Sequence, residues 1–82
     1  MSHNNEKNNE ISLCVTQALD RYFTDLDGEK PFGVYDMVIR EVEKPMLQSV
    51  LRQTRGNQTQ AAEILGMTRN TLRRKLSEHG LI

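Results

Sequence analysis

The sequence predicts an all-α protein with four helices, the last two of which form a helix-turn-helix. Three observations predict this class. Apolar side chains recur at helical spacings between residues 11 and 51, Gly and Pro residues separate these stretches, and two short helix patterns flank Gly66. With 82 residues, 37% of them hydrophobic, the chain allows one small domain. Such a domain buries a modest share of its surface, and pairing with a second copy would relieve that shortage.

The N-terminal part contains a polar segment and then a first amphipathic helix. Residues 1–10 include four asparagines and no hydrophobic residue after Met1, so we expect a disordered tail. From Ile11 to Leu26 the apolar residues form a stripe about 100° wide, which predicts a helix. We expect this helix to end near residues 27–28 and a short linker to follow. The stripe consists of Ile11, Val15, Ala18, Leu19, Tyr22 and Leu26.

A second helix is expected to start between Phe32 and Tyr35 and to continue to about Leu51. Its apolar residues cover more than half of the helix circumference, which is more than one neighbouring helix would bury. The available partners are the first helix and a second copy of the chain. Pro45 removes a backbone donor, so we expect a kink near residues 41–45. Two separate helices broken before Pro45 are the alternative, but the apolar register continues through the proline and favours one helix.

The third helix pattern has recognisable start and stop signals. Asn57 is a good N-cap, and Gln60 stands three residues later, as in a capping box. Gly66 can adopt a positive φ and end the helix. A small apolar face that allows close helix packing is expected from Ala61, Ala62, Ile64 and Leu65.

The fourth pattern is a short helix rich in cations. Thr68 is its expected N-cap, and Leu72 and Leu76 lie four apart on its apolar face. Together with the preceding helix it predicts a helix-turn-helix, whose second helix enters the DNA major groove. A helical hairpin with a solvated basic face is the alternative, but the combined caps, glycine turn and cations favour the helix-turn-helix. Residues expected to point away from the apolar face are Arg69, Asn70, Arg73 and Arg74.

Charge is distributed unevenly along a chain whose net charge is zero. Residues 1–45 contain five cations and nine acids, a net charge of −4, whereas residues 46–82 contain six cations and two acids, a net charge of +4. Local potential decides whether a surface attracts DNA, so the C-terminal part is compatible with nucleic-acid binding.

Other residues argue against an enzyme or a metal protein. Cys14 is the only cysteine, which excludes an intrachain disulfide and a Cys-based metal site, and we expect a core or interface thiol in a reduced compartment. His3 and His79 have no acid or nucleophile at a suggestive spacing, and partial burial is expected for His79. No cofactor or metal is expected. No apolar run is long enough to span a membrane, and no signal peptide opens the chain.

Residues 52–82 resemble the C-terminal helix-turn-helix of the Fis (factor for inversion stimulation) family, and the similarity extends upstream to about Ile11. It rests on the helix-turn-helix residues and on two further matches, Glu43-Lys44-Pro45-Met46-Leu47 and Arg55-Gly56-Asn57-Gln58-Thr59. The resemblance implies that residues 11–56 pair with a second chain in an intertwined four-helix dimer core, and that residues 57–82 bind DNA. The dimer-core residues would be Val38, Val42, Pro45, Met46, Leu47 and Val50.

The resemblance also implies a role for individual side chains on DNA. Arg69 would read a base, since Arg pairs bidentately with guanine. Thr68 replaces the usual Asn and reaches less far, and Gln60 replaces a basic residue, so weaker DNA contacts are expected there. The expected DNA-binding residues are Asn57, Thr59, Gln60, Thr68, Arg69, Asn70, Thr71, Arg73, Arg74 and Lys75.

The expected partners are double-stranded DNA, a second copy of the chain and, as a candidate, RNA polymerase. The resemblance implies a bacterial, nucleoid-associated transcription regulator in the cytoplasm that bends A/T-rich DNA. The resemblance associates activation of site-specific recombinases with a mobile N-terminal hairpin, whereas only ten polar residues precede the first helix here, so we expect no stimulation of DNA invertases. Two alternatives remain: a regulatory module like the tail of enhancer-binding activators, and a dimeric adaptor whose basic face meets acidic proteins.

Overall fold

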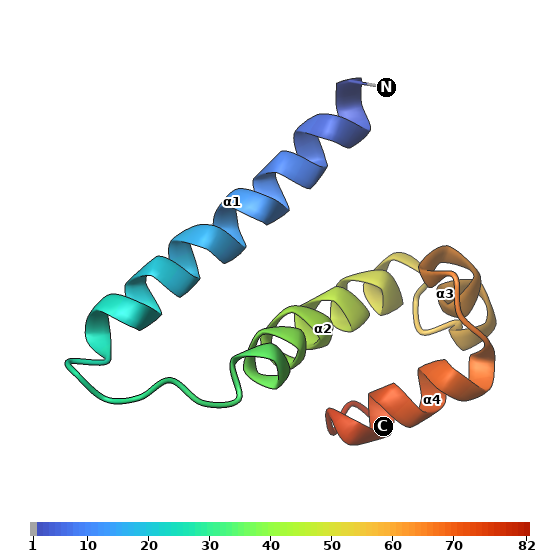
Figure 1. Cartoon of the computed structure of the whole chain (residues 1–82). Coiled ribbons are helices and arrows are strands. Elements are labelled where there is room, and N and C mark those ends of the chain that lie inside the picture. Colours follow the sequence, from blue (N-terminus) through green and yellow to red (C-terminus); the bar gives the residue numbers. More distant parts are fainter. Residues whose placement is uncertain (1) are drawn as a thin grey trace. The chain divides into compact units, whose positions relative to one another are not determined.

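The computed structural model describes residues 2–82, with the side chains of residues 9–82, and this part of the chain contains four helices and no strand (Figure 1). The helices are α1 (Ser2–Asp25), α2 (Val34–Gln53), α3 (Gln58–Leu65) and α4 (Arg69–Glu78). The expected all-α chain with four helices is confirmed. The chain divides into two compact units, Met1–Val38 and Ile39–Ile82, which we describe separately.

α1 starts earlier than the apolar pattern predicts. Helical backbone begins at Ser2 rather than at Ile11, so residues 2–10 do not form the disordered tail that their composition predicts, and Met1 lies outside the described residues. Lengthening a formed helix adds one hydrogen bond per residue without a new nucleus, and Asn, Glu and Lys are tolerated in helices. The helix ends at Asp25, and a turn with Gly28 at φ 86° follows.

α2 is one helix that continues through Pro45, as the unbroken apolar register predicts. Gly33, at φ 64°, precedes it and accepts the first hydrogen bond, from the amide of Met37 at 3.1 Å. Beyond its C-terminus Gly56, at φ 83°, donates its amide to the carbonyl of Leu51 at 2.8 Å. A left-handed residue that returns an amide to the last turn satisfies carbonyls that the helix leaves unpaired.

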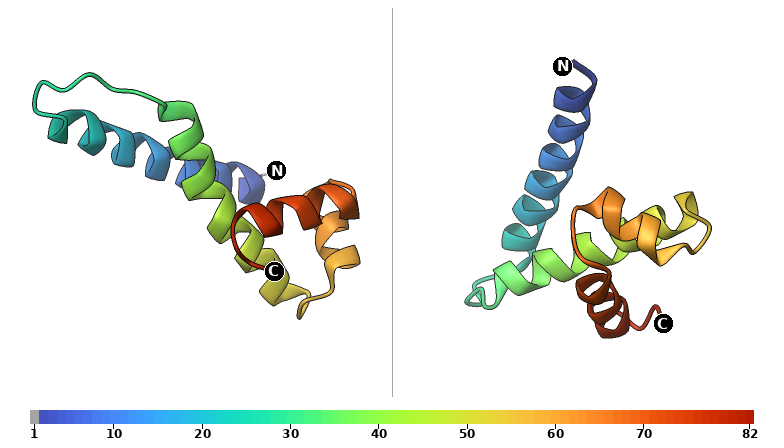
Figure 2. Two further views of the ribbon diagram at one scale, coloured as in Figure 1. Left: turned by 90° about the horizontal axis from the view of Figure 1, so that it is seen from below. Right: turned by 90° about the vertical axis from the view of Figure 1, so that its right-hand side faces the viewer.

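The buried core lies in the second unit, where α2, α3 and α4 meet (Figure 2). Leu47, Leu72 and Leu76 are fully buried, and burying each leucine contributes roughly 1.5–3 kcal/mol. The small side chains of Ala61 and Ala62 complete the core and let α3 approach closely. Five partly buried hydrophobic residues surround it: Val50, Leu51, Leu65, Met67 and Leu81. This core holds α3 and α4 in place on α2.

Candidate nucleic-acid interface

The start of α3 is fixed by Asn57. Its side-chain Oδ1 accepts a hydrogen bond from the amide of Gln60 at 3.1 Å, and its φ and ψ are −74° and 103°, as expected of an N-cap. The reciprocal half of a capping box is missing, because the amide of Asn57 donates to the carbonyl of Thr54 at 3.0 Å instead. The predicted cap is therefore confirmed, and the predicted capping box is only half formed.

A tight glycine turn separates α3 from α4. Gly66 lies at φ 77° and ψ 33°, in the left-handed region, and its amide donates to the carbonyl of Glu63 at 3.2 Å. The amide of Met67 reaches back to the carbonyl of Ala62 at 3.0 Å. These bonds satisfy the final carbonyls of α3, as a Schellman-type ending does. The positive φ predicted for Gly66 is confirmed.

Thr68 caps α4, as the sequence predicts. Its Oγ1 accepts from the amide of Thr71 at 3.2 Å and donates to the Oγ1 of Thr71 at 3.0 Å. The hydroxyl of Thr68 is thus occupied by the helix start, whereas the hydroxyl hydrogen of Thr71 is free to turn outward. Thr68 and Thr71 therefore differ in what they can offer to a ligand.

The exposed surface of α4 carries uncompensated cations. The side chains of Arg69, Arg73 and Arg74 are exposed, and none forms an ion pair with any carboxylate among residues 9–82. Arg73 and Arg74 point away from the buried Leu72, as expected. Arg69 is different, because its spacing places it near the apolar side. It is exposed because it is the first residue of the helix.

The other predicted DNA-binding residues lie on the same helix-turn-helix. Asn57, Thr59, Gln60, Thr68 and Asn70 are exposed, and Thr71 is half-buried. One prediction for α3 is wrong: Ile64 was expected on the apolar face but is 63% exposed. The alanines make the buried face of α3 narrow, so a side chain at its edge stays in solvent.

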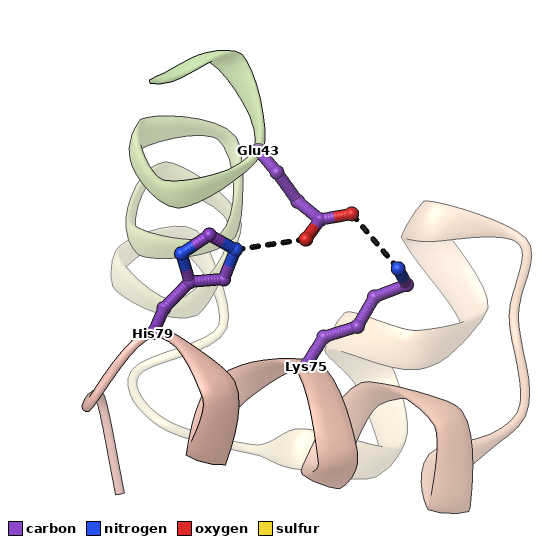
Figure 3. A network of polar contacts seen from close by, with 3 residues as sticks. All are labelled: Glu43, Lys75 and His79. Carbon is purple, nitrogen blue, oxygen red and sulfur yellow. Dashed lines mark hydrogen bonds and ion pairs between the residues drawn. The ribbon is translucent and has the colours of Figure 1, made fainter. Parts of the chain in front are cut away.

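Lys75 differs from the other cations of α4, because its ammonium group is engaged by Glu43 of α2 (Figure 3). The Nζ of Lys75 lies 2.9 Å from Oε2 of Glu43, and the Nε2 of His79 lies 2.8 Å from Oε1. These hydrogen bonds, from Lys75 first and His79 second, hold the pKa of Glu43 below its ordinary value. His79 is buried, as predicted, but through a polar contact rather than apolar packing alone.

Glu43, which links α2 to α4 in this contact, is the residue that sequence reasoning missed. In the sequence, Glu43 stands out only as the first residue of the segment 43–47, which matches the Fis family. Its two partners lie 32 and 36 residues further along the chain. The only available signal was the pair of basic side chains one helical turn apart, at positions 75 and 79.

The predicted dimer-core residues fall into two groups. Val42, Pro45 and Met46 are exposed, and they remain available to a partner chain. Leu47 is fully buried in the core of its own chain, so it offers no surface to a second copy. Cys14 is exposed, so it is not the core thiol that was one of the two expected roles, while the interface role stays a prediction; α1 is apolar on one side, and Cys14 lies outside the stripe. Val38 and Val50 are half-buried.

Neither a membrane span nor a metal cluster is found in the part of the chain that the structure describes. None of its helices is long and apolar enough to cross a membrane, and no three His, Cys, Asp or Glu side chains gather there as metal ligands would.

The capped α3, the glycine turn and the cationic surface of α4 define a helix-turn-helix protein. A family model described as "Bacterial regulatory protein, Fis family" matches residues 38–79, from the middle of α2 to the C-cap of α4. The chain belongs to the Fis family of bacterial regulatory proteins.

Curated relatives agree with this assignment. The chain is 55% identical over 73 residues to a protein of Neisseria meningitidis serogroup A described as a Fis-like DNA-binding protein, and the match covers 89% of this chain and 92% of the relative. A Fis-like DNA-binding protein of Ralstonia nicotianae is 50% identical over 74 residues, with 90% and 96% covered. The DNA-binding protein Fis of Actinobacillus succinogenes is also 50% identical over 74 residues, with 90% and 75% covered.

Proposed function

We propose that this protein binds DNA as a homodimer, bends it, and acts in the bacterial cytoplasm as a nucleoid-associated transcription regulator without enzymatic activity. One observation carries the proposal: α4 exposes Arg69, Arg73 and Arg74, and none of them forms an ion pair with a carboxylate among the described side chains. Guanidinium groups on the second helix of a helix-turn-helix suit both phosphates and guanine edges. The relatives are named as DNA-binding proteins, which supports the same conclusion.

Arg69 and Arg74 are assigned different roles in DNA binding. Arg69 begins α4, where helix-turn-helix proteins contact base edges, and we assign it base readout. Arg74 lies about 140° around the helix from Arg69, at 100° per residue, and we assign it a phosphate contact. DNA bending rests on the family resemblance, which implies recognition helices closer together than one turn of DNA.

Pairing of two chains is supported by a row of exposed apolar side chains on α2. Ile39, Val42 and Met46 follow one another at spacings of three and four, so they share one side of the helix, and they are 41%, 37% and 43% exposed. Burying this row against a second copy would add apolar contact area that the small core of one chain lacks. Sedimentation at micromolar concentration should show a species near twice the 9.5 kDa chain mass, and a folded monomer would contradict the dimer.

Binding measured on matched and single-base-altered sites at several salt concentrations tests the DNA contacts. Arg69→Ala should cost roughly 1–3 kcal/mol per half-site and flatten the preference at one base pair. Arg74→Ala should weaken binding to all sequences equally and lower the salt slope by about one unit. Arg21→Ala, which removes an exposed cation of α1, is the matched control. It should change neither the preference at any base pair nor the salt slope. Uniform loss of affinity in both α4 variants would exclude base readout by Arg69.

A further inference from the structure

One carboxylate of α2 engages two side chains of α4. Each oxygen of Glu43 has its own partner, Lys75 at 2.9 Å and His79 at 2.8 Å (Figure 3). The side chains of Glu43 and His79 are only 15% and 3% exposed, so water competes little for these bonds. No other ion pair occurs among the side chains of residues 9–82.

The two partners on α4 make this contact directional. Lys75 and His79 are four residues apart, so they lie one above the other on one flank of the helix. A bond to each fixes both the rotation of α4 about its axis and its position along that axis. The other buried side chains of α4, Leu72 and Leu76, join an apolar cluster with Leu47 of α2 and the alanines of α3, and such apolar contacts are non-directional.

The position of Glu43 on α2 connects two surfaces. At 100° per residue, Glu43 lies between the buried Leu47 and the exposed row of Ile39, Val42 and Met46. Leu47 packs against α3 and α4, whereas the exposed row is the surface that we assign to the partner chain. Glu43 therefore stands where the recognition helix meets the helix that pairs with a second copy.

We propose that Glu43 is a positioning residue that fixes the recognition helix on the pairing helix, and that Lys75 serves this contact instead of binding phosphate. The proposal rests on the proposed function, because the two recognition helices of a dimer would then meet DNA at a set distance and angle. Arg69, Arg73 and Arg74 remain the cations available to DNA on α4, since Lys75 is committed to Glu43. The geometry of the DNA site would depend on a residue that does not touch DNA.

A first test needs no DNA. Glu43→Gln removes the negative charge and leaves one acceptor oxygen where the carboxylate offers one to each partner, so the charge-assisted bonding of the wild-type contact is weakened. Amide hydrogen exchange along α4 should become about tenfold faster in this variant, the factor that losing one charge-assisted hydrogen bond produces. Glu41→Gln changes an exposed carboxylate of the same helix that has no ion pair among the described side chains, and it should leave exchange at the wild-type rate.

A second test measures DNA geometry. Binding sites whose half-sites are moved apart or together by one base pair should be disfavoured by the wild-type protein, and Glu43→Gln should reduce this discrimination about tenfold. Lys75→Met retains the aliphatic stem without the ammonium group. It should loosen the spacing preference but keep the wild-type salt slope, whereas Arg74→Met should lower the slope by about one unit.

The outcomes separate the two proposals. Wild-type rates of α4 exchange in both Glu43→Gln and Lys75→Met would overturn the positioning role, whatever happens on DNA. A salt slope lowered equally by Lys75→Met and Arg74→Met would also overturn it, because Lys75 would then contact phosphate. If the wild-type protein binds no DNA, the proposed function fails, and the exchange rates still decide whether Glu43 positions α4.

Discussion

The cap of α4 offers a substitution whose effect can be calculated from the structure. Thr68→Ala removes the Oγ1 that accepts from the amide of Thr71 at 3.2 Å, and Thr68 is exposed, so no buried contact is lost with it. Loss of an N-cap costs about 1 kcal/mol, and a loss of that size lowers the melting temperature of a domain this small by about 4–8 °C. Thr68→Ser retains the hydroxyl and should melt within about 1 °C of the wild-type protein.

Thermal unfolding at one fixed protein concentration measures this difference, since the melting midpoint of the proposed dimer would depend on concentration. DNA binding then shows whether Thr68 does more than cap. Its hydroxyl is occupied by Thr71, so Thr68→Ala should weaken matched and base-altered sites by the same factor. Equal melting of the Ala and Ser variants would refute the cap. A changed preference at one base pair in Thr68→Ala, with preference kept in Thr68→Ser, would show that the hydroxyl reads a base.

Two further predictions concern the turn and the acid response. Gly66→Ala should cost about 1–2 kcal/mol, from backbone strain at φ 77° alone, because an added Cβ meets no atom within 4 Å; Gly66→Asn should cost less in the same urea titration. The lowered pKa of Glu43 means that its extra stabilisation is present above its ordinary value of 4.5 and is lost as pH falls through the lower folded value. Urea unfolding between pH 6 and pH 3 should therefore show a steeper loss of stability in the wild-type protein than in Glu43→Gln, and parallel curves would contradict this.

Local chemistry explains why much of this fold could be predicted from the sequence. The caps at Asn57 and Thr68 and the positive φ of Gly66 each depend on residues within three or four positions, so a short window of sequence contains the cause. The continuity of α2 through Pro45 could also be predicted, because the apolar residues keep the same helical register on both sides of the proline.

Contacts between helices could not be predicted in the same way. Whether Leu47 faces its own chain or a partner depends on where α3 and α4 pack, and helical spacing alone gives both choices equal weight. The exposure of Ile64 has a similar origin, since the width of the buried face of α3 is set by how closely its alanines approach the core. The half-formed capping box arises because the amide of Asn57 already has an acceptor in the turn after α2.

The basic run at residues 73–75 shows how geometry changes the meaning of a sequence feature. Three successive cations look like one patch, but consecutive helical residues are about 100° apart, so they face three directions. Leu72 and Leu76 fix which direction is inward, and Lys75 then falls beside α2, where Glu43 neutralises it. Arg73 and Arg74 stay in solvent. Counting cations would therefore overstate the charge that α4 presents to DNA by one for each chain, and the salt dependence of binding should reflect the smaller number.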